Sequence, residues 1–535
     1  MSVFDRGVAW FASVPGKIAV RVTARKADGG DWSMWRWFFT AFAVIAAGMI
    51  FIGHSYYFGT PIFETDDLAA NSLQINRAIH LLEIYGNYSR FGFHHPGPAF
   101  IYVYAAGEAL FYNLLHVVPA PENGHLLAAA LLQSSFLAAA IATIARYARP
   151  NRGLFVAGAI AIALADFQLA GNHEFAIWPP DQLVVPFACF VVVAVAVACG
   201  RIGLLPLLVI CGGFLVHGHV AQPLFVVPMT SIALGLGFWR SSRQDALTVA
   251  GFVRRNLKPL ALALALLGIF LLPLLIDLTR GSDSNLATIL RYLARSRGSG
   301  DTHSATQVVA YVVSFLGYPT NVPILNFTRS QLVPFVEGHW AGLMASLAVL
   351  IVLPAALLLT HLARRTRTDG DGAADEPSGD SRFFVTYYGF LALGTALTFA
   401  WANVQTGPMY AFNSFFVYGL MFAAALPPLV AICRRLPLKR ARLGTALMVL
   451  VVAGLTMNSA FTLRIAEDPD GLPLNASVQA VIAARSSSSP VLLEFKQADW
   501  IDAAGVALAL QRGNVRWFVE PNWGFMFGSG SVRDP

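Results

Sequence analysis

Two adjacent carboxylates, Asp66 and Asp67, follow the first long apolar stretch of the chain, in the run Phe63-Glu64-Thr65-Asp66-Asp67-Leu68. Carboxylates at the water edge of an apolar protein can act as a general base or bind a metal ion. A structural alternative is open, because an Asp pair that precedes a helix often caps its N-terminus. Acidic groups beside a hydrophobic protein are unfavourable unless they are used, so we favour a chemical role.

The loop further along combines a cation with two imidazoles, in Tyr88-Ser89-Arg90-Phe91-Gly92-Phe93-His94-His95-Pro96-Gly97-Pro98. Its Pro-Gly-Pro end is typical of a chain that turns into a helix. Arg90, His94 and His95 could bind a phosphate. His94 could also join Asp66 and Asp67 in binding a divalent cation, Mg²⁺ or Mn²⁺. Taken singly, each is a common solvated loop residue, and a His pair alone is weak support for a metal.

Two further groups could bind a substrate. His217 and His219 lie between two apolar runs, where a turn explains them as well as a site does. The segment 284–295 has apolar residues at helical spacing, with Arg291 and Arg295 between them. Such a helix either anchors to lipid headgroups or, through its arginines, holds a lipid-linked phosphate.

The elements that position these residues are predicted to be membrane helices. The chain has 535 residues, of which 56% are hydrophobic and 13% charged, against about 25% charged in soluble domains. Several apolar runs reach the roughly 20 residues that cross a bilayer. The first run starts too late for a cleaved signal peptide and is expected to be a retained anchor. The four cysteines lie in or beside apolar runs and indicate neither disulfides nor zinc.

Basic clusters predict the topology. Lys and Arg gather in short segments between apolar runs, which explains the net charge of +7 better than a nucleic-acid partner does. With these clusters in the cytoplasm, about 11 spans are expected, the N-terminus lies inside and the C-terminus outside. The expected spans are 35–54, 125–146, 153–170, 181–199, 203–217, 220–239, 259–277, 338–362, 383–402, 411–432 and 443–462. By parity, the apolar runs 96–116 and 308–316 are peripheral.

This topology divides the chain into expected parts. The segment 68–83 should form an amphipathic helix flat on the outer interface, with Asp66 and Asp67 at its N-terminus, where the helix dipole favours carboxylates. The tail alternates helix-like and strand-like pieces and should form a small α/β unit that leans on the membrane domain. The parts are a basic cytoplasmic segment 1–34, a membrane domain 35–462 with outer loops 55–124 and 278–337 and a cytoplasmic linker 363–382, and an extracytoplasmic tail 463–535.

Most remaining polar residues near predicted span ends fall on the outer side. Random polar residues should decorate both faces, so their shared side indicates a site. They are Asn172, His173, Glu174, Asp181, Gln222, Glu337, His339, Asn403 and Gln405.

An early outer acidic motif, juxtamembrane helices with a Pro-rich start, about a dozen spans and a soluble tail resemble the GT-C superfamily of integral-membrane glycosyltransferases. The segment His94-His95-Pro96-Gly97-Pro98 looks like the place where the aminoarabinose and mannose transferases of this superfamily carry a charged residue followed by prolines. Asp66 and Asp67 look like the catalytic acidic motif. Relatives usually have an Asp-Glu pair leading straight into the helix, and here the order is Glu64-Thr65-Asp66-Asp67.

The resemblance implies transfer of a sugar from a polyprenyl-phosphate donor to an envelope glycan, lipid or protein at the outer face of a bacterial cytoplasmic (inner) membrane. Asp66 or Asp67 would be the general base, and Arg or His residues, with or without a divalent cation, would stabilise the leaving phosphate. No nucleotide cofactor is expected, because the chain has no Walker or Rossmann fingerprint in a suitable setting.

Two other functions remain open. A transporter or flippase of lipid-linked sugars would also need many spans, although transporters usually place ionisable groups near the bilayer midplane and often have repeated halves. An envelope polymerase or ligase would be a transferase on a different membrane scaffold. An acidic pair outside any groove that leads to lipid would favour either one.

Overall fold

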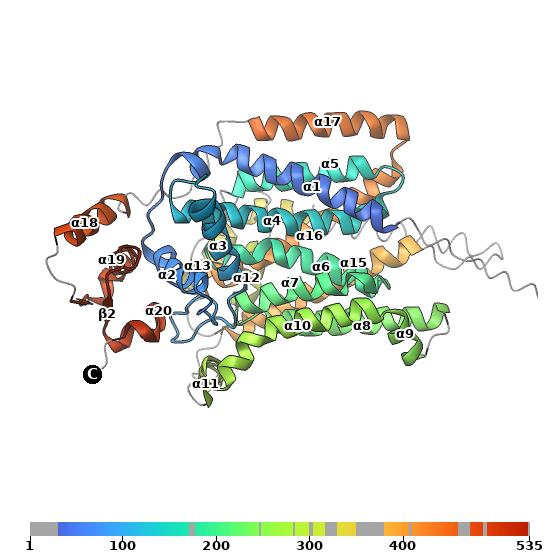
Figure 1. Cartoon of the computed structure of the whole chain (residues 1–535). Coiled ribbons are helices and arrows are strands. Elements are labelled where there is room, and N and C mark those ends of the chain that lie inside the picture. The colour runs from blue at the N-terminus through green and yellow to red at the C-terminus, as the bar shows by residue number, and fades with distance from the viewer. Residues whose placement is uncertain are drawn as a thin grey trace, which may run out of the picture.

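The chain folds into a bundle of long apolar helices with a small unit at one end (Figure 1). The computed structural model describes residues 30–170, 177–245, 248–281, 284–298, 303–315, 329–348, 379–405, 409–457, 471–484 and 489–532. Within this part, 8 helices are long and apolar enough to cross a membrane. They are α1 (Gly30–Ile52), α4 (Pro121–Ala145), α6 (Val184–Ala198), α8 (Pro223–Asp245), α10 (Leu257–Leu278), α15 (Gly379–Val404), α16 (Phe416–Arg435) and α17 (Leu438–Met457).

The remaining expected spans are only partly matched. The spans 153–170 and 203–217 coincide with the shorter apolar helices α5 (Arg152–Ala170) and α7 (Leu205–Gly218). The span 338–362 overlaps α13 (Arg329–Leu347) and continues beyond the described residues. Most of the expected segments 1–34 and 363–382 also lies outside them.

The centre of the bundle is α6, a run of Val, Ala and Phe that is buried along its whole length. A helix that is apolar all round needs apolar neighbours on every side, and α6 packs against α4, α7, α8, α15 and α16. Gly419 of α16 allows a close crossing, because a Cβ there would meet the Val184 carbonyl oxygen of α6. At the periphery, α10 exposes leucines such as Leu264 and Leu272, as a lipid-facing helix would.

Four connections converge at one end of the bundle. The 53–120 segment contains η1 (Ser55–Gly59), α2 (Asp66–Ile79), α3 (Ala99–Gly107) and η2 (Glu108–Leu114). It contacts the α5–α6 connection through Trp178, the end of α7 through His217, and the end of α10 through Asp277. Beyond α10, helix α11 (Asn285–Gly298) lies at the same end (Figure 1). The opposite end carries α9 (Val249–Arg255).

The C-terminal unit is a parallel strand pair with helices around it. Strands β1 (Val491–Leu493) and β2 (Trp517–Val519) pair with Val491 opposite Trp517 and Leu493 opposite Val519. Helix α19 (Trp500–Arg512) connects them, as parallel pairing requires a crossover. The two strands lie within segments of the tail where the pattern predicts strands. The unit is completed by α18 (Gly471–Ala484) and α20 (Gly524–Phe527).

Helix α2 lies between this unit and the membrane helices, at the left of Figure 1. Ala69 and Leu73 pack into the core of the C-terminal unit, whereas Ile75 and Ala78 pack into the core of the bundle. The expectation of a helix lying flat on the interface is wrong in one respect, since the C-terminal unit covers most of its length. Polar side chains of α2 are buried as well, against the loop that follows it: the Gln74 amide donates to the Gly86 carbonyl at 2.9 Å.

Two apolar runs expected to be peripheral form short helices. Helix α12 (Ala305–Ser314), which overlaps the run 308–316, is too short to span a bilayer and packs against α13 and α15. The run 96–116 is divided between α3 and η2.

Candidate functional site

Asp67 is held by aromatic donors from two other segments. The Tyr88 hydroxyl donates a short hydrogen bond to Oδ1, and the Trp178 indole nitrogen donates to Oδ2 at 3.1 Å. The Asp67 side chain keeps 22% of its surface exposed. Burial and the neighbouring Asp67 carboxylate raise the pKa of Tyr88, so the phenol remains a donor at neutral pH. The arrangement fixes the carboxylate while leaving it open to a reactant.

Asp66 has a different setting. Its φ of +53° lies in the left-handed region, which Asp tolerates better than most residues. Thr65, and neither aspartate, occupies the N-cap position of α2. Both aspartates lie in the first turn of α2, where the helix dipole favours carboxylates, so a structural role of the pair stays open beside a chemical one. Strained backbone of this kind concentrates at functional segments, and here it turns the chain between Glu64 and Asp67.

Arg90 connects Asp67 to the C-terminal unit. Its guanidinium lies 3.8 Å from Asp67 Oδ1 and 5.1 Å from the centre of the Trp500 ring. The Arg90 side chain is 68% exposed, so it retains donors for an anionic ligand. An Arg fork is well matched to a phosphate. Of the residues predicted to bind phosphate, Arg90 is the one that the structure places beside the acidic pair.

The predicted histidines are buried or half-buried, and His94 stacks on Tyr85. The rings of His95 and His219 lie 4.7 Å apart, and His95 Nδ1 accepts a hydrogen bond from the Val220 amide. Burial lowers the pKa of His94 and of His219 to about 4, and burial with the nearby His219 lowers that of His95 well below its usual value. At neutral pH these three rings are uncharged. They do not supply the positive charge expected for phosphate binding.

His217 packs against the Pro96-Gly97-Pro98 segment that follows His95. Its Nε2 lies 2.7 Å from the Phe270 carbonyl oxygen, and its backbone carbonyl accepts from the Gly97 amide. A Cβ on Gly97 would come within 2.5 Å of the His217 ring. Glycine in Pro96-Gly97-Pro98 is thus required for the loop to approach α7, a packing role that the Pro-Gly-Pro pattern did not predict.

Helix α11 lies against the loop that carries Arg90. The Tyr292 ring packs against Phe91 and Phe93, and the Asn285 side chain bonds to both backbone groups of His94. The Asp277 carboxylate accepts from the first two amides of α11 and from the Tyr85 hydroxyl.

Arg291 and Arg295 of α11 are both exposed. Arg291 bonds within its own helix, to the Ala287 carbonyl and the Thr288 hydroxyl. The structure thus joins α11 to the site through Tyr292 and Asn285, while both arginines keep exposed surface.

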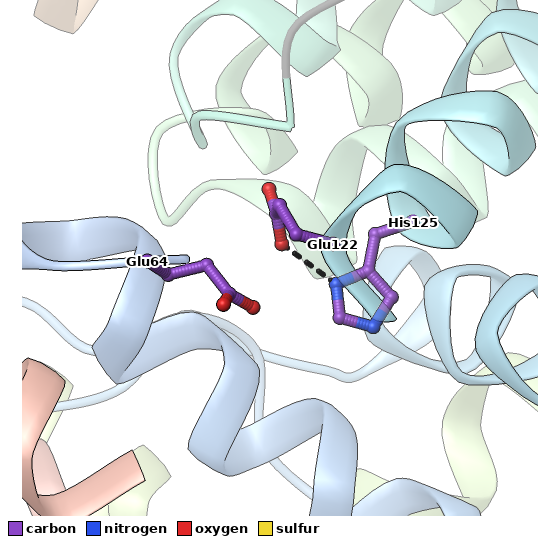
Figure 2. A group of neighbouring side chains, drawn as sticks. All are labelled: Glu64, Glu122 and His125. Carbon is purple, nitrogen blue, oxygen red and sulfur yellow. Dashed lines mark hydrogen bonds and ion pairs between the residues drawn. The ribbon is translucent and has the colours of Figure 1, made fainter. Parts of the chain in front are cut away.

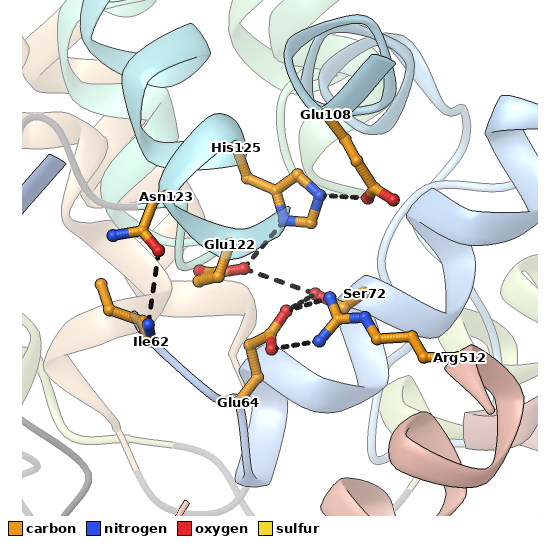
Figure 3. A network of polar contacts seen from close by, with 8 residues as sticks. All are labelled: Ile62, Glu64, Ser72, Glu108, Glu122, Asn123, His125 and Arg512. Carbon is orange, nitrogen blue, oxygen red and sulfur yellow. Dashed lines mark hydrogen bonds and ion pairs between the residues drawn. The ribbon is translucent and has the colours of Figure 1, made fainter. Parts of the chain in front are cut away.

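A buried ion pair lies directly before the acidic pair. Arg512 of α19 donates to both oxygens of Glu64, at 2.6 and 2.7 Å, and Ser72 donates to Glu64 at 2.9 Å (Figure 3). The Glu64 side chain has no exposed surface. Burial would raise the pKa of Glu64, but the charge and hydrogen bonds of Arg512 outweigh it and lower the pKa to about 2.

The first turn of α4 continues this network into the bundle. His125 Nδ1 lies 2.8 Å from Glu122, and its Nε2 lies 2.7 Å from Glu108. Figure 2 shows Glu64, Glu122 and His125 pointing toward one another. Atoms of these three side chains lie within 4.8 Å of one another, which is a spacing that could hold a metal ion. Each of the three already bonds to protein groups.

The metal ligands predicted from sequence are not brought together. Among the described residues, Glu64, Glu122 and His125 are the sole group with metal-ligand spacing. The set Asp66, Asp67 and His94 is not such a group. Of the other predicted polar residues, Asn172, His173 and Glu174 lie outside the described part of the chain.

Sequence reasoning missed several members of the site. Glu122 and His125 had a local signal, since residues three apart share a helix face and Pro121 marks the helix start. Arg512 and Trp500 had none, because only the docking of the C-terminal unit brings them to the first loop.

No protein-family model and no curated protein matches this chain.

Proposed function

We propose that the protein is a membrane glycosyltransferase that moves a sugar from a polyprenyl-phosphate donor to a hydroxyl of an envelope glycan, lipid or protein, with Asp67 as the general base. Asp67 takes the proton from the acceptor hydroxyl as the acceptor oxygen bonds to the anomeric carbon. The bond from that carbon to the phosphate oxygen breaks, and the lipid phosphate leaves.

The observation that carries the proposal is the setting of Asp67. Its carboxylate is oriented by Tyr88 and Trp178, is partly exposed, and lies beside the exposed guanidinium of Arg90. A base and an anion-binding group in one open place are what displacement of a phosphate requires. Asp66 remains the alternative base.

Helix α11 supports a lipid donor. It exposes Leu290 and Leu293 together with Arg291 and Arg295, and its Tyr292 packs against Phe91, the neighbour of Arg90. An apolar surface for a lipid chain and cations for its phosphate would thus lie next to the base.

The proposed orientation follows from the charges. Arg152, Arg201 and Arg240 contact helix ends at the end of the bundle away from Asp67. The positive-inside rule makes that end cytoplasmic. We therefore assign the Asp67 end and the C-terminal unit to the outer side of a bacterial cytoplasmic membrane.

The test is transfer by purified protein in nanodiscs, supplied with a panel of polyprenyl-phosphate sugars and candidate acceptors. Wild type should release the lipid phosphate and form a glycoside. Asp67→Asn should lower turnover about 100-fold or more, while Asp502→Asn, an exposed acid of α19, should retain it. Full turnover by Asp67→Asn with loss by Asp66→Asn would move the base to Asp66. Full turnover by both would refute the assignment.

A transporter of lipid-linked sugars is the second candidate. The buried Glu122 and His125 at the start of a candidate span, with Glu108 of η2 bonded to His125, favour it, because ionisable groups in spans often mark transport pathways. In sealed vesicles, translocation of an intact lipid-linked sugar without glycoside formation, unaffected by Asp67→Asn, would support this function instead.

A further inference from the structure

The C-terminal unit contacts α2 at both of its ends. At the start of α2, Arg512 binds Glu64, and a Cβ on Gly505 of α19 would lie only 3.2 Å from the Glu64 carbonyl oxygen. At the other end, Gln511 donates to the Asn76 amide oxygen, and Arg77 donates to the Phe527 carbonyl. These contacts join parts of the chain more than 400 residues apart, at separations of 435, 448 and 450.

The segment before α2 is also fixed on the membrane side. Asn123 in the first turn of α4 donates to the carbonyls of Tyr56 and Thr60. It also accepts from the Ile62 amide (Figure 3). The segment is thus held at Ile62 by the bundle and at Glu64 by the C-terminal unit. Asp66 and Asp67 follow at once.

We propose that Arg512 is a positioning residue of the site, acting through Glu64 to set the backbone that presents Asp67. The inference rests on the proposed function for its activity readout. Arg512 donates to both Glu64 oxygens, which fixes the carboxylate in orientation as well as in place. Thr65 and Asp66 separate Glu64 from Asp67, and a movement of about 1 Å at a reacting group can lower a rate about 100-fold. The C-terminal unit is then part of the active machinery.

The charge balance explains why an Arg is needed at this position. Glu64 lies within 4.8 Å of ligand atoms of Glu122 and His125, and Glu108 is the other partner of His125. Without Arg512, Glu64 would be a buried carboxylate near that of Glu122. Removing one partner of a buried pair leaves an uncompensated charge, so the segment would move toward water.

The experiment compares Arg512→Met and Arg512→Lys with Arg516→Met, which makes the same substitution on an exposed Arg of the same unit. Two readouts are taken on full-length protein in nanodiscs: kcat and KM for transfer, and amide hydrogen exchange of the peptide 63–72. Arg512→Met should lower kcat about tenfold or more with KM within about twofold, and speed exchange of 63–72. Arg512→Lys should be intermediate, and Arg516→Met should match wild type.

A double variant, the exchanged pair Glu64→Arg with Arg512→Glu, swaps the two charges. It distinguishes a positioning role of the ion pair from a direct chemical role of the Glu64 carboxylate. Restored exchange protection with recovered kcat supports positioning. Restored protection with kcat still lost would overturn it, as would an Arg512→Met protein with wild-type kcat and wild-type exchange. If Arg512→Met does not fold, the Arg512→Lys and exchanged-pair proteins carry the test. If wild type transfers no sugar at all, the proposed function fails, and the exchange of 63–72 alone decides whether Arg512 positions this segment.

Discussion

The indole nitrogen of Trp178 donates a hydrogen bond of 3.1 Å to Asp67, a residue 111 positions earlier in the chain. Trp178 follows α5 and precedes α6, so this bond ties the acidic pair to the centre of the bundle. Its ring also packs edge-on against Phe412 and Phe415. A rigid donor of this kind fixes where the carboxylate points.

Trp178→Phe should impair the reaction more than the fold. The substitution removes the donor but keeps an aromatic ring for Phe412 and Phe415. A hydrogen bond to a charged group contributes about 1.5–3 kcal/mol, so kcat should fall about tenfold or more. Steady-state transfer kinetics would measure this change in kcat. Trp239→Phe, at an exposed position of α8, is the control; equal kinetics for both variants would contradict the role of Trp178.

Arg90→Met should weaken donor binding with little change in stability. Exposed ion pairs contribute about 0–1 kcal/mol, and the Arg90 side chain is mostly exposed. The KM for the lipid-phosphate donor should rise about tenfold, the equivalent of about 1.4 kcal/mol, while the thermal unfolding midpoint stays the same. Arg254→Met, on α9 at the opposite end, should alter neither quantity. An unchanged KM in Arg90→Met would remove Arg90 from the site.

Docking of the C-terminal unit should weaken in acid through Glu64. The pKa of this carboxyl is lowered from 4.5 to about 2. Its contribution to the stability of docking is therefore complete above about pH 4.5 and is lost as the pH falls toward about 2. Hydrogen exchange of residues 63–72, measured from about pH 6 to about pH 3 and corrected for intrinsic rates, should show protection declining over this range.

Glu64→Gln is the reference for that experiment. The Glu64→Gln protein should show weaker protection of residues 63–72 at neutral pH. Its protection should also decline less as the pH falls, because it lacks the Glu64 carboxyl. Parallel curves for wild type and Glu64→Gln would show that another group controls the transition.

Gly97→Ala should destabilise the loop that carries the histidines. The new Cβ would lie 2.5 Å from His217 Nδ1, and that ring is held by the Phe270 carbonyl. Overpacking of this kind costs about 1–3 kcal/mol, which should appear as a lower unfolding temperature in detergent. Gly235→Ala, where a Cβ would meet no atom within 4 Å, should not lower it. A Gly97→Ala protein as stable as wild type would show that the loop can move away from α7.

Most of the bundle could be predicted from sequence, because a bilayer imposes length and composition on each span separately. Eight of the expected spans match helices long and apolar enough to cross a membrane. The helical form of 284–295 could also be predicted, since its apolar spacing is local. The burial of α2 could not. Its polar side chains predict an exposed face, but Asn71 and Gln74 bond to the loop at 86–87. The C-terminal unit packs on another part of α2, at Ala69 and Leu73.

The sequence by itself determined the membrane class of the protein and named Asp66, Asp67 and Arg90 among its candidate site residues, since composition and local motifs carry that information. Only the tertiary structure decided that His94, His95 and His219 are held uncharged among protein groups and that Glu64 binds Arg512. The physical reason is that burial and ion pairing depend on segments hundreds of residues apart, and no local pattern records which of them meet.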